Sequence, residues 1–266
     1  MLSGVGNGAD LAAHGIQTIA HLPGVGRNLI DHLDIFLRHS SSKPVSLLRE
    51  LRFDRLAINM ARAFLFGTGP VTESPIAAGG YFESRPRLQY PDLQAFFLPI
   101  ADIGQVRPLS RGVLKLASPD ADAAPLIDPN YLGDPTDMAA TVAGLKIGRT
   151  ILSQPAFDRY RGKETAPGRH VNSDEDLAAY VREAAGTVFH PVGTARMGND
   201  PLAVVDERLR VHGIEGLRVA DASVMPTIPS GNTNAPTMMV AEKAADMISE
   251  DFKKALAKGH RTFASV

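Results

Sequence analysis

The sequence predicts a mixed fold of the α+β and α/β classes, in which an antiparallel sheet with packed helices occupies the middle of the chain. Two patterns indicate the sheet and its helices. Apolar and polar residues alternate between positions 75 and 100, which is typical of strands with one buried face. Between 134 and 185, apolar residues recur at helical spacing behind clear helix starts. The turn-rich flanks of the chain indicate pieces of a second unit.

The composition excludes several classes of protein. The chain has 266 residues and a formal net charge of −1, so no basic surplus indicates nucleic acid or an anionic membrane as a partner. No apolar run approaches the roughly 20 residues that span a bilayer. The first residues lack the basic start and apolar core of a signal peptide, so a cytoplasmic location is expected. The absence of cysteine excludes disulfides, thiolate metal sites and a cysteine nucleophile.

The first 33 residues predict short elements joined by turns. Residues 9–14 predict a helix that ends at Gly15, and residues 16–22 predict a strand. The glycine-spaced run 22–32 either lets backbone approach a ligand closely or forms a surface turn. Asp31, His32 and Asp34 resemble a metal cluster. Ligands this close in sequence, without a further partner, favour a turn, so no metal is predicted.

The next segments alternate between helical and extended patterns. Residues 35–67 predict a helical stretch with a solvated arginine face, followed by a glycine and proline break. Strands are predicted within 75–100 and at 113–117, and an extended segment at 125–131.

Two helix starts follow. Asp134 can cap a helix whose first residue is Pro135, and Ser173 can start another with Leu177 and Val181 facing inward. Residues 251–266 predict a frayed tail.

A histidine near the end of the chain is the first candidate for chemistry. His190 lies between Phe189 and Pro191, and Pro191 limits the freedom of the backbone that holds the imidazole. Histidine titrates near neutrality, so it can take a proton from a hydroxyl and return it later. The alternative is a buried histidine that is hydrogen-bonded to backbone.

Two further segments point to ligand binding. Residues 217–221 predict a strand that ends in Asp221, and this carboxylate suits a ribose hydroxyl or, alternatively, the cap of the next turn. Residues 230–237 lead into a helix with Pro236 near its start. Free N–H groups at such a start favour an anionic group. Asn234 can donate to a substrate oxygen or simply cap the helix.

The order and spacing of these motifs resemble the C-terminal part of the glucose–methanol–choline (GMC) oxidoreductases, especially the choline dehydrogenase-like branch. The resemblance extends over nearly the whole chain. Ala195 departs from the cysteine that is common in that branch. The matching motifs are Leu2–Gly6, Pro23–His32, His190–Gly198 and Leu217–Thr237.

The resemblance implies a role for each matching residue. His190 corresponds to the catalytic base for the substrate hydroxyl, and Asn234 to a second catalytic position. Asp221 and Ala222 correspond to the strand end that meets the pyrophosphate and ribose of FAD. The remaining positions implied to bind the cofactor are Asn232 and Thr233 near the flavin ring, and Asn28, Leu29 and Asp31 in a loop of the FAD domain.

The resemblance also implies a division of the chain and a missing part. Residues 1–33 and 193–266 correspond to pieces of a Rossmann-like FAD-binding domain, and residues 34–192 to the substrate-binding domain. The Gly-x-Gly-x-x-Gly loop that binds the ADP part of FAD in this family is not found in the sequence. Met1 is therefore expected to be an internal methionine of a longer protein, whose N-terminal half could also be a separate chain.

The function implied is an FAD-dependent oxidoreductase that acts on the CH–OH group of an alcohol or choline-like substrate and passes hydride to flavin N5. The alternative is an inactive remnant, or a subunit that needs an N-terminal partner chain. Oxygen, a quinone and a cytochrome all stay open as electron acceptors. A hydrolase using Ser3 or His190 is disfavoured because the sequence has no Gly-x-Ser-x-Gly elbow.

Overall fold

A computed structural model describes residues 1–43, 50, 52–72, 76, 78–97 and 101–257. The chain divides into two compact units. Unit 1 consists of Met1–Asp31, Ser110–Gly133 and Phe189–Val266, and unit 2 consists of His32–Leu109 and Asp134–Val188. Each unit is therefore assembled from segments that lie far apart in the sequence.

Unit 2 is built on a six-stranded antiparallel sheet. Its strands run in the order β10-β4-β7-β6-β5, and β11 also pairs with β4. The bounds are β4 (Leu33–Ser41), β5 (Ala78–Phe82), β6 (Leu93–Phe97), β7 (Ala101–Gln105), β10 (Arg161–Ala166) and β11 (Gly186–Thr187).

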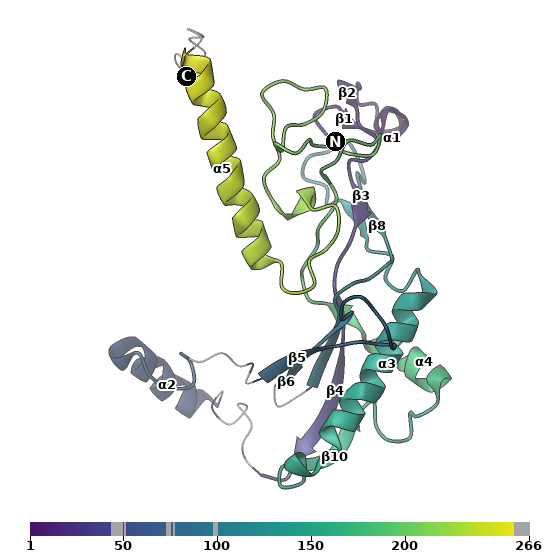
Figure 1. The fold of residues 1–266 in the computed structure, drawn as a ribbon, viewed down its shortest axis with the longest axis vertical. Coiled ribbons are helices and arrows are strands. Elements are labelled where there is room, and N and C mark those ends of the chain that lie inside the picture. The colour runs from purple at the N-terminus through teal and green to yellow at the C-terminus, as the bar shows by residue number, and fades with distance from the viewer. Residues whose placement is uncertain (44–49, 51, 73–75, 77, 98–100, 258–266) are drawn as a thin grey trace. The chain divides into compact units, whose positions relative to one another are not determined.

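One face of this sheet is covered by α3 (Pro135–Leu152) (Figure 1). Ile35 and Leu37 of β4 are completely buried beneath the helix. Small residues of α3 permit this close packing, because a Cβ added at Gly144 or Gly148 would come within 2.8 or 2.5 Å of Ile103. The sheet and α3 thus form the core of unit 2.

The two helix starts predicted in this unit are confirmed. The Asp134 carboxylate accepts a hydrogen bond from the Thr136 N–H at 2.8 Å, with Pro135 as the first residue of α3. Ser173 caps α4 (Asp174–Ala184) by accepting from the Asp176 N–H at 3.1 Å. Leu177 and Val181 of α4 are fully buried, as expected from the pattern.

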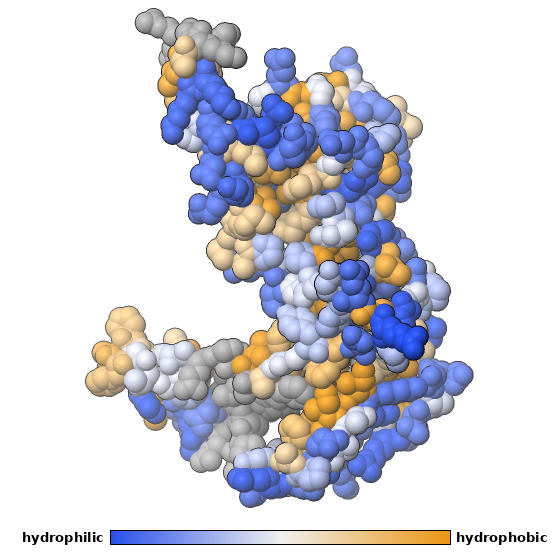
Figure 2. All heavy atoms as spheres, in the orientation of Figure 1, coloured by the Kyte–Doolittle hydropathy of each residue, from blue (hydrophilic) through white to orange (hydrophobic). Residues whose placement is uncertain are grey.

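The prediction of one helical stretch over 35–67 is wrong for its first part. Residues 33–41 form β4, because Leu33, Ile35 and Leu37 alternate with Asp34, Phe36 and Arg38 and share one buried face. Only α2 (Phe53–Phe66) is helical, while residues 44–49 and 51 lie outside the described part of the chain. Apolar as well as charged side chains of α2 face solvent, including Phe53 and Phe64, and Figure 2 shows apolar surface at this helix.

The other predicted strands are present but shorter than expected. The patterns at 75–100, 113–117 and 125–131 correspond to β5 with β6, to β8 (Gly112–Lys115) and to β9 (Leu126–Asp128). Only β2 (Ala20–His21) forms within 16–22. Residues 73–75, 77 and 98–100 are not described. The strands β7 and β10 were not predicted.

Unit 1 contains little regular sheet. β1 (Val5–Gly6) pairs in parallel with β2, and β3 (Arg27–Leu29), β8 and β9 form an antiparallel sheet. Its helical elements are α1 (Gly8–Ala13), which Asn7 caps, η3 (Ala222–Val224) and α5 (Asn234–Ala257). The short η2 (Pro155–Phe157) belongs to unit 2.

A buried apolar cluster holds unit 1 together. It joins residues before position 31 to the C-terminal region and to α5, through side chains that include Ile30, Val192, Val205, Val224 and Val240. The expected division placed 110–133 in the middle domain, whereas this segment belongs to unit 1 because β8 pairs with β3. Helix α5 extends to Ala257, so the first part of the expected tail is helical, and residues 258–266 are not described. Among the described helices, none has the length and apolar character needed to cross a membrane.

The face of the unit 2 sheet opposite α3 holds a carboxyl pair. Asp34 is only 4% exposed, and burial raises its pKa to about 9, with a further contribution from the neighbouring Asp102 carboxyl. One oxygen of Asp102 is buried without a hydrogen-bond partner among the described residues. The Asp34 side chain is therefore protonated at neutral pH.

Ionisation of this carboxyl pair is expected to lower the free energy of unfolding as pH rises. Because the pKa of Asp34 is raised on folding, its contribution is complete below about pH 4 and is lost as pH rises towards 9. Over this range we expect it to lower the free energy of unfolding by at most about 1.4 kcal/mol per pH unit. Asp34→Asn should flatten the slope measured by urea unfolding from pH 6 to 9, whereas the exposed Asp122→Asn should leave it unchanged. Equal slopes in the wild type and Asp34→Asn would contradict this assignment.

Candidate active site in unit 1

The segment 190–197 lies between two other parts of unit 1. On one side, Ile30 and Val192 exchange backbone hydrogen bonds of 3.1 and 2.9 Å. On the other side, the Ala195 N–H donates to the Ser223 carbonyl at 2.9 Å, next to Ala222. The segment that begins at His190 is thus hydrogen-bonded to the predicted cofactor segment 28–31 on one side. On the other side it is hydrogen-bonded next to the predicted cofactor segment 221–222.

Asp31 fixes the backbone at His190. Its Oδ1 accepts a hydrogen bond from the His190 N–H at 2.9 Å, and its Oδ2 accepts one from the Tyr131 hydroxyl. The carboxylate is only 8% exposed, so both bonds lie in a poorly solvated environment. Asp31 was predicted in a cofactor-binding loop, and its contacts in this structure add a positioning role towards His190.

The His190 side chain is suited to accept a proton. It is partly buried, and this burial lowers its pKa below the usual value, while the nearby Asp31 carboxylate opposes the shift. A lowered pKa keeps the imidazole neutral at pH 7. A neutral imidazole has one unprotonated nitrogen, which is the form required of a general base.

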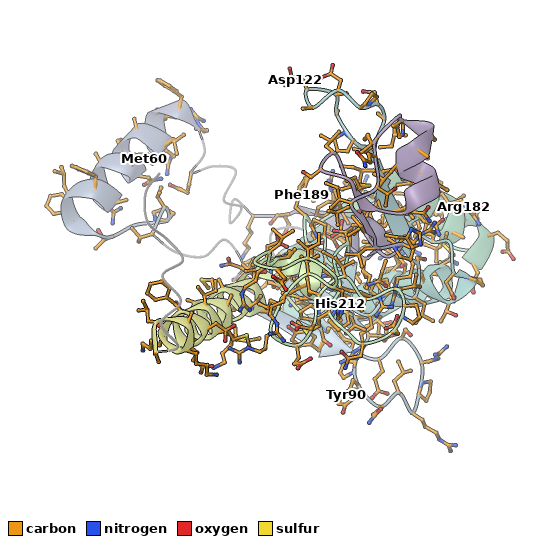
Figure 3. The ribbon with its side chains drawn as sticks, turned by 90° about the horizontal axis from the view of Figure 1, so that it is seen from above. Met60, Tyr90, Asp122, Arg182, Phe189 and His212 are labelled. Atoms are coloured by element: carbon orange, nitrogen blue, oxygen red, sulfur yellow. The ribbon has the colours of Figure 1, made fainter. Side chains whose placement is uncertain are left out.

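The residue before His190 has an unusual backbone. Phe189, which is labelled in Figure 3, adopts φ = 61°. The residue is 82% exposed. A left-handed conformation is costly for a bulky residue and occurs most often at functional sites. This turn sets the direction in which the chain enters His190 and Pro191.

Asn28 of β3 is hydrogen-bonded to the segment after His190. Its φ is 60°, its amide donates to the carbonyls of Gly193 at 3.4 Å and Pro226 at 3.2 Å, and Arg111 Nε donates to its Oδ1 at 3.1 Å. Asn tolerates this left-handed backbone better than most residues. In this structure the amide N–H and carbonyl groups of the Asn28 side chain are therefore hydrogen-bonded to protein groups.

The Asn28 contact requires glycine at 193. Gly193 has φ = 94°, and an added Cβ would lie 2.3 Å from the Asn28 carbonyl oxygen. Gly213 has a similar φ of 73° but open space around it, so it is a matched control for backbone strain alone. We expect Gly213→Ala to cost about 1–2 kcal/mol of stability, and Gly193→Ala to cost about 1–3 kcal/mol more through overpacking. Urea unfolding measures both, and equal losses would show that the Asn28 contact is unimportant.

The glycines of the 22–32 run pack against protein rather than against an open site. A Cβ at Gly24 would lie 1.9 Å from the Leu202 carbonyl oxygen, and one at Gly26 would lie 2.2 Å from that of Leu114. The Leu114 N–H also donates to the Gly26 carbonyl at 2.7 Å. Close approach of backbone explains these glycines, and the partner is the chain itself. The Leu29 side chain after them is buried in the same unit.

Asp221 caps a short helix. Its Oδ1 accepts hydrogen bonds from the Ser223 N–H at 2.8 Å and the Ser223 hydroxyl at 2.5 Å, at the start of η3. The predicted strand 217–221 is wrong, since only one isolated bridge, Arg210↔Arg218, forms there. A strand needs consecutive pairs along a neighbour, and this segment has one such pair in the described part of the chain. Asp221 remains exposed to solvent and Ala222 is partly buried.

The start of α5 is open to a ligand. The helix begins at Asn234, so this residue lies within the first turn and does not precede it as a cap. Thr233 is 8% exposed, and its carbonyl accepts from the Thr237 N–H at 2.9 Å. Asn232 and Asn234 are exposed, and the Asn234 side chain makes no hydrogen bond to any described residue. The first N–H groups of α5 and the Asn234 amide are all donors.

These donors fit an anionic or carbonyl-bearing ring system such as a flavin. The N–H groups and the dipole at the α5 start favour partial negative charge, and Asn234 adds a side-chain donor. Helix α5 packs on η3 through the same apolar cluster that contains Val192, two residues after His190. No group of three His, Asp or Glu side chains suited to a metal ion occurs among the described residues.

Comparison with known proteins agrees with these features. Residues 108–241 match the family described as GMC oxidoreductase, over its C-terminal domain. The chain belongs to the GMC oxidoreductase family. The resemblance to the choline dehydrogenase-like branch is therefore confirmed, and this family binds FAD.

Relatives of known name share this family. The oxygen-dependent choline dehydrogenase of Chromohalobacter salexigens is 42% identical over 262 residues, covering 92% of this chain and 47% of that protein. Human mitochondrial choline dehydrogenase is 42% identical over 269 residues, covering 93% of this chain and 45% of that protein. The chain spans about half the length of the curated relatives it matches.

Solved structures support the predicted fold class. Formate oxidase from Aspergillus oryzae superposes with a TM-score of 0.89 at 26% identity, covering 95% of this chain and 52% of that chain. The mixed class, with an antiparallel sheet and helices beside pieces of a GMC fold, is therefore confirmed.

Three residues at this site were not found from the sequence. Tyr131 binds Asp31 from 100 positions away, and Arg111 binds Asn28 from 83 positions away. The exposed, strained Phe189 was noted only as a neighbour of His190. Local patterns contain no signal for such long-range contacts, and the segment 125–131 was predicted only as extended.

Proposed function

We propose that this chain forms the C-terminal part of an FAD-dependent oxidoreductase that acts on the CH–OH group of an alcohol. The observation that supports it most directly is His190, a partly buried imidazole of lowered pKa whose backbone is fixed by Asp31. Membership of the GMC oxidoreductase family supports the same reaction class. Unit 1 would form part of the cofactor-binding domain, and unit 2 the substrate-binding domain.

The chain's own residues would handle the proton and the substrate oxygen. An unprotonated imidazole nitrogen of His190 takes the hydroxyl proton, and the Asn234 amide donates a hydrogen bond to the same oxygen. FAD, when bound, supplies the acceptor for the hydride that leaves the α-carbon. Holding these groups in fixed positions relative to the substrate contributes much of the rate enhancement.

The predicted cofactor residues would contact different parts of FAD. The α5 start, with Asn232 and Thr233, suits the flavin ring, and Asp221 with Ala222 suits the ribose and pyrophosphate. Asn28, Leu29 and Asp31 would hold this surface in place without contacting FAD through their side chains, because the contacts described for these side chains are with protein groups.

We propose the class of substrate and of electron acceptor from the printed names of the relatives. A choline-like alcohol is favoured by the two choline dehydrogenases at 42% identity. The printed names "oxygen-dependent choline dehydrogenase" and, for a Pseudomonas putida relative, "alcohol dehydrogenase [acceptor]" leave oxygen or another acceptor open. Because the chain spans about half of these relatives, a further polypeptide segment would complete the FAD site.

FAD binding tests this proposal. The chain would be titrated with FAD alone, and also after co-expression with the N-terminal half of the Chromohalobacter salexigens relative, and the flavin spectrum of the purified protein recorded. We expect a yellow protein at least in the second arm, and weaker binding by Asp221→Asn than by Asp122→Asn. A colourless protein in both arms would contradict an FAD site in this chain.

A further inference from the structure

A polar pocket in unit 2 is lined by none of the residues assigned to alcohol oxidation. It occurs where the end of α3 meets β4 and β10, which lie together at one end of the unit (Figure 1). Its volume of about 370 Å³ falls within the range of roughly 300–1,000 Å³ that is usual for ligand sites. The pocket is lined by His39, Arg149, Thr150, Ser153, Arg161, Glu164, Arg169 and Asn172.

The floor of the pocket is an internally satisfied ion pair. The Glu164 side chain is 4% exposed and accepts hydrogen bonds from Arg149 at 2.7 and 3.2 Å. Arg149 also donates to the carbonyls of Gly168 at 3.2 Å and Val171 at 2.8 Å. Glu164 therefore has little acceptor capacity left for a cation, because its charge is already neutralised.

The wall of the pocket still offers positive charge and donors. Arg161 donates to the Leu152 carbonyl at the end of α3, and it pairs with Asp158 at 2.5 Å. Arg169 is exposed and forms no hydrogen bond or ion pair with any residue that the structure describes. Asn172 likewise presents an exposed amide. Three guanidinium groups thus line the pocket, and that of Arg169 has no partner among the described residues.

A buried nitrogen in the wall also lacks a partner. His39 Nε2 is inaccessible to solvent and makes no hydrogen bond within the described part of the chain, since the nearest carboxylate oxygen, of Glu164, lies at 3.9 Å. Its Nδ1 lies 3.4 Å from the Gly162 carbonyl, and the side chain is 13% exposed. An unpaired buried polar atom in the lining of a pocket calls for an explanation such as a bound water or ion.

We propose that this pocket binds a small oxyanion of the phosphate class, as free phosphate or as a phosphomonoester. Arg169 supplies a planar guanidinium, the group best matched to phosphate oxygens, and Arg161 and Asn172 supply further donors. A cation is disfavoured by the three arginines, and an apolar ligand by the polar lining.

The test compares phosphate with chloride at equal ionic strength. Thermal unfolding of the 266-residue chain would be followed with sodium phosphate and with sodium chloride, for wild type, Arg169→Gln and Lys163→Gln. Lys163 is an exposed cation on the same strand, β10, and does not line the pocket, so it is the matched control. Because phosphate also stabilises proteins by exclusion from their surfaces, only a difference between variants reports binding.

We expect phosphate to raise the Tm of the wild type and Lys163→Gln by several degrees more than that of Arg169→Gln, as mass action predicts. Equilibrium dialysis with radiolabelled inorganic phosphate, and with glycerol phosphate in a second arm, gives the same comparison without unfolding. Tighter binding in the second arm would assign the site to phosphomonoesters. Equal Tm shifts in all three proteins, together with equal dialysis, would overturn the proposal.

Discussion

Replacing His190 with alanine is expected to lower kcat for alcohol oxidation by about 10²–10⁴-fold, the usual contribution of a general base. The reason is that the neutral imidazole is the proposed acceptor of the hydroxyl proton. The measurement is steady-state oxidation of choline by the FAD-loaded protein, containing this chain and the segment that completes its FAD site. His170→Ala is the control, since His170 is an exposed histidine in unit 2.

The pH dependence of the same reaction provides a second readout. Burial lowers the pKa of His190, so the imidazole is neutral at pH 7 and becomes protonated at a lower pH than an ordinary histidine. We expect kcat/KM to be flat near neutrality and to fall as pH decreases through this lowered pKa. His190→Ala should lose that acidic limb. Wild-type turnover in His190→Ala, or an unchanged acidic limb, would remove His190 from the mechanism.

Replacing Asp31 is expected to have the second-largest effect. Asp31→Ala leaves the His190 N–H and the Tyr131 hydroxyl without their buried acceptor. Each buried donor left unpaired costs about 1–3 kcal/mol, so we expect the two together to lower the free energy of unfolding by roughly 2–6 kcal/mol. Urea unfolding measures this loss, with Tyr131→Phe and the double variant completing a thermodynamic cycle. Additive losses would show that the two residues are not coupled.

The conservative variant separates positioning from folding. Asp31→Asn keeps the shape of the side chain and one acceptor oxygen, so we expect it to fold. Because the backbone at His190 is less firmly held, kcat should fall by about 10–100-fold, with little change in KM. A KM change without a kcat change would instead place Asp31 in substrate or cofactor binding.

Local sequence rules predicted the helices of unit 2 well. Asp134, Pro135 and Ser173 act within one turn of the helices they start, so their effect depends on neighbours in sequence. The same rules missed β4, because the period-two pattern of Leu33, Ile35 and Leu37 was averaged with the helical segment that follows. The strand predicted at 217–221 failed for the opposite reason, since its apolar residues lack a continuous strand partner.

The candidate site was predicted as a set of positions but not as an arrangement. His190, Asp221 and Asn234 were all proposed as site residues from residue type and motif order. The hydrogen bond from the His190 N–H to Asp31 spans 159 positions, and that from Asn28 to Pro226 spans 198. Contacts at this separation depend on how the two units divide the chain. No local pattern predicts that residues 110–133 belong with the ends of the sequence.

In the proposed mechanism, the alcohol passes its hydroxyl proton to His190 while a bound flavin is reduced. Anaerobic addition of choline or another primary alcohol to the FAD-loaded protein tests this most directly, with the oxidised flavin absorbance followed in a stopped-flow instrument. We predict rapid bleaching in the wild type and in His170→Ala, and bleaching slowed by about 10²-fold or more in His190→Ala. Bleaching at the same rate in all three proteins, or in none, would contradict the account.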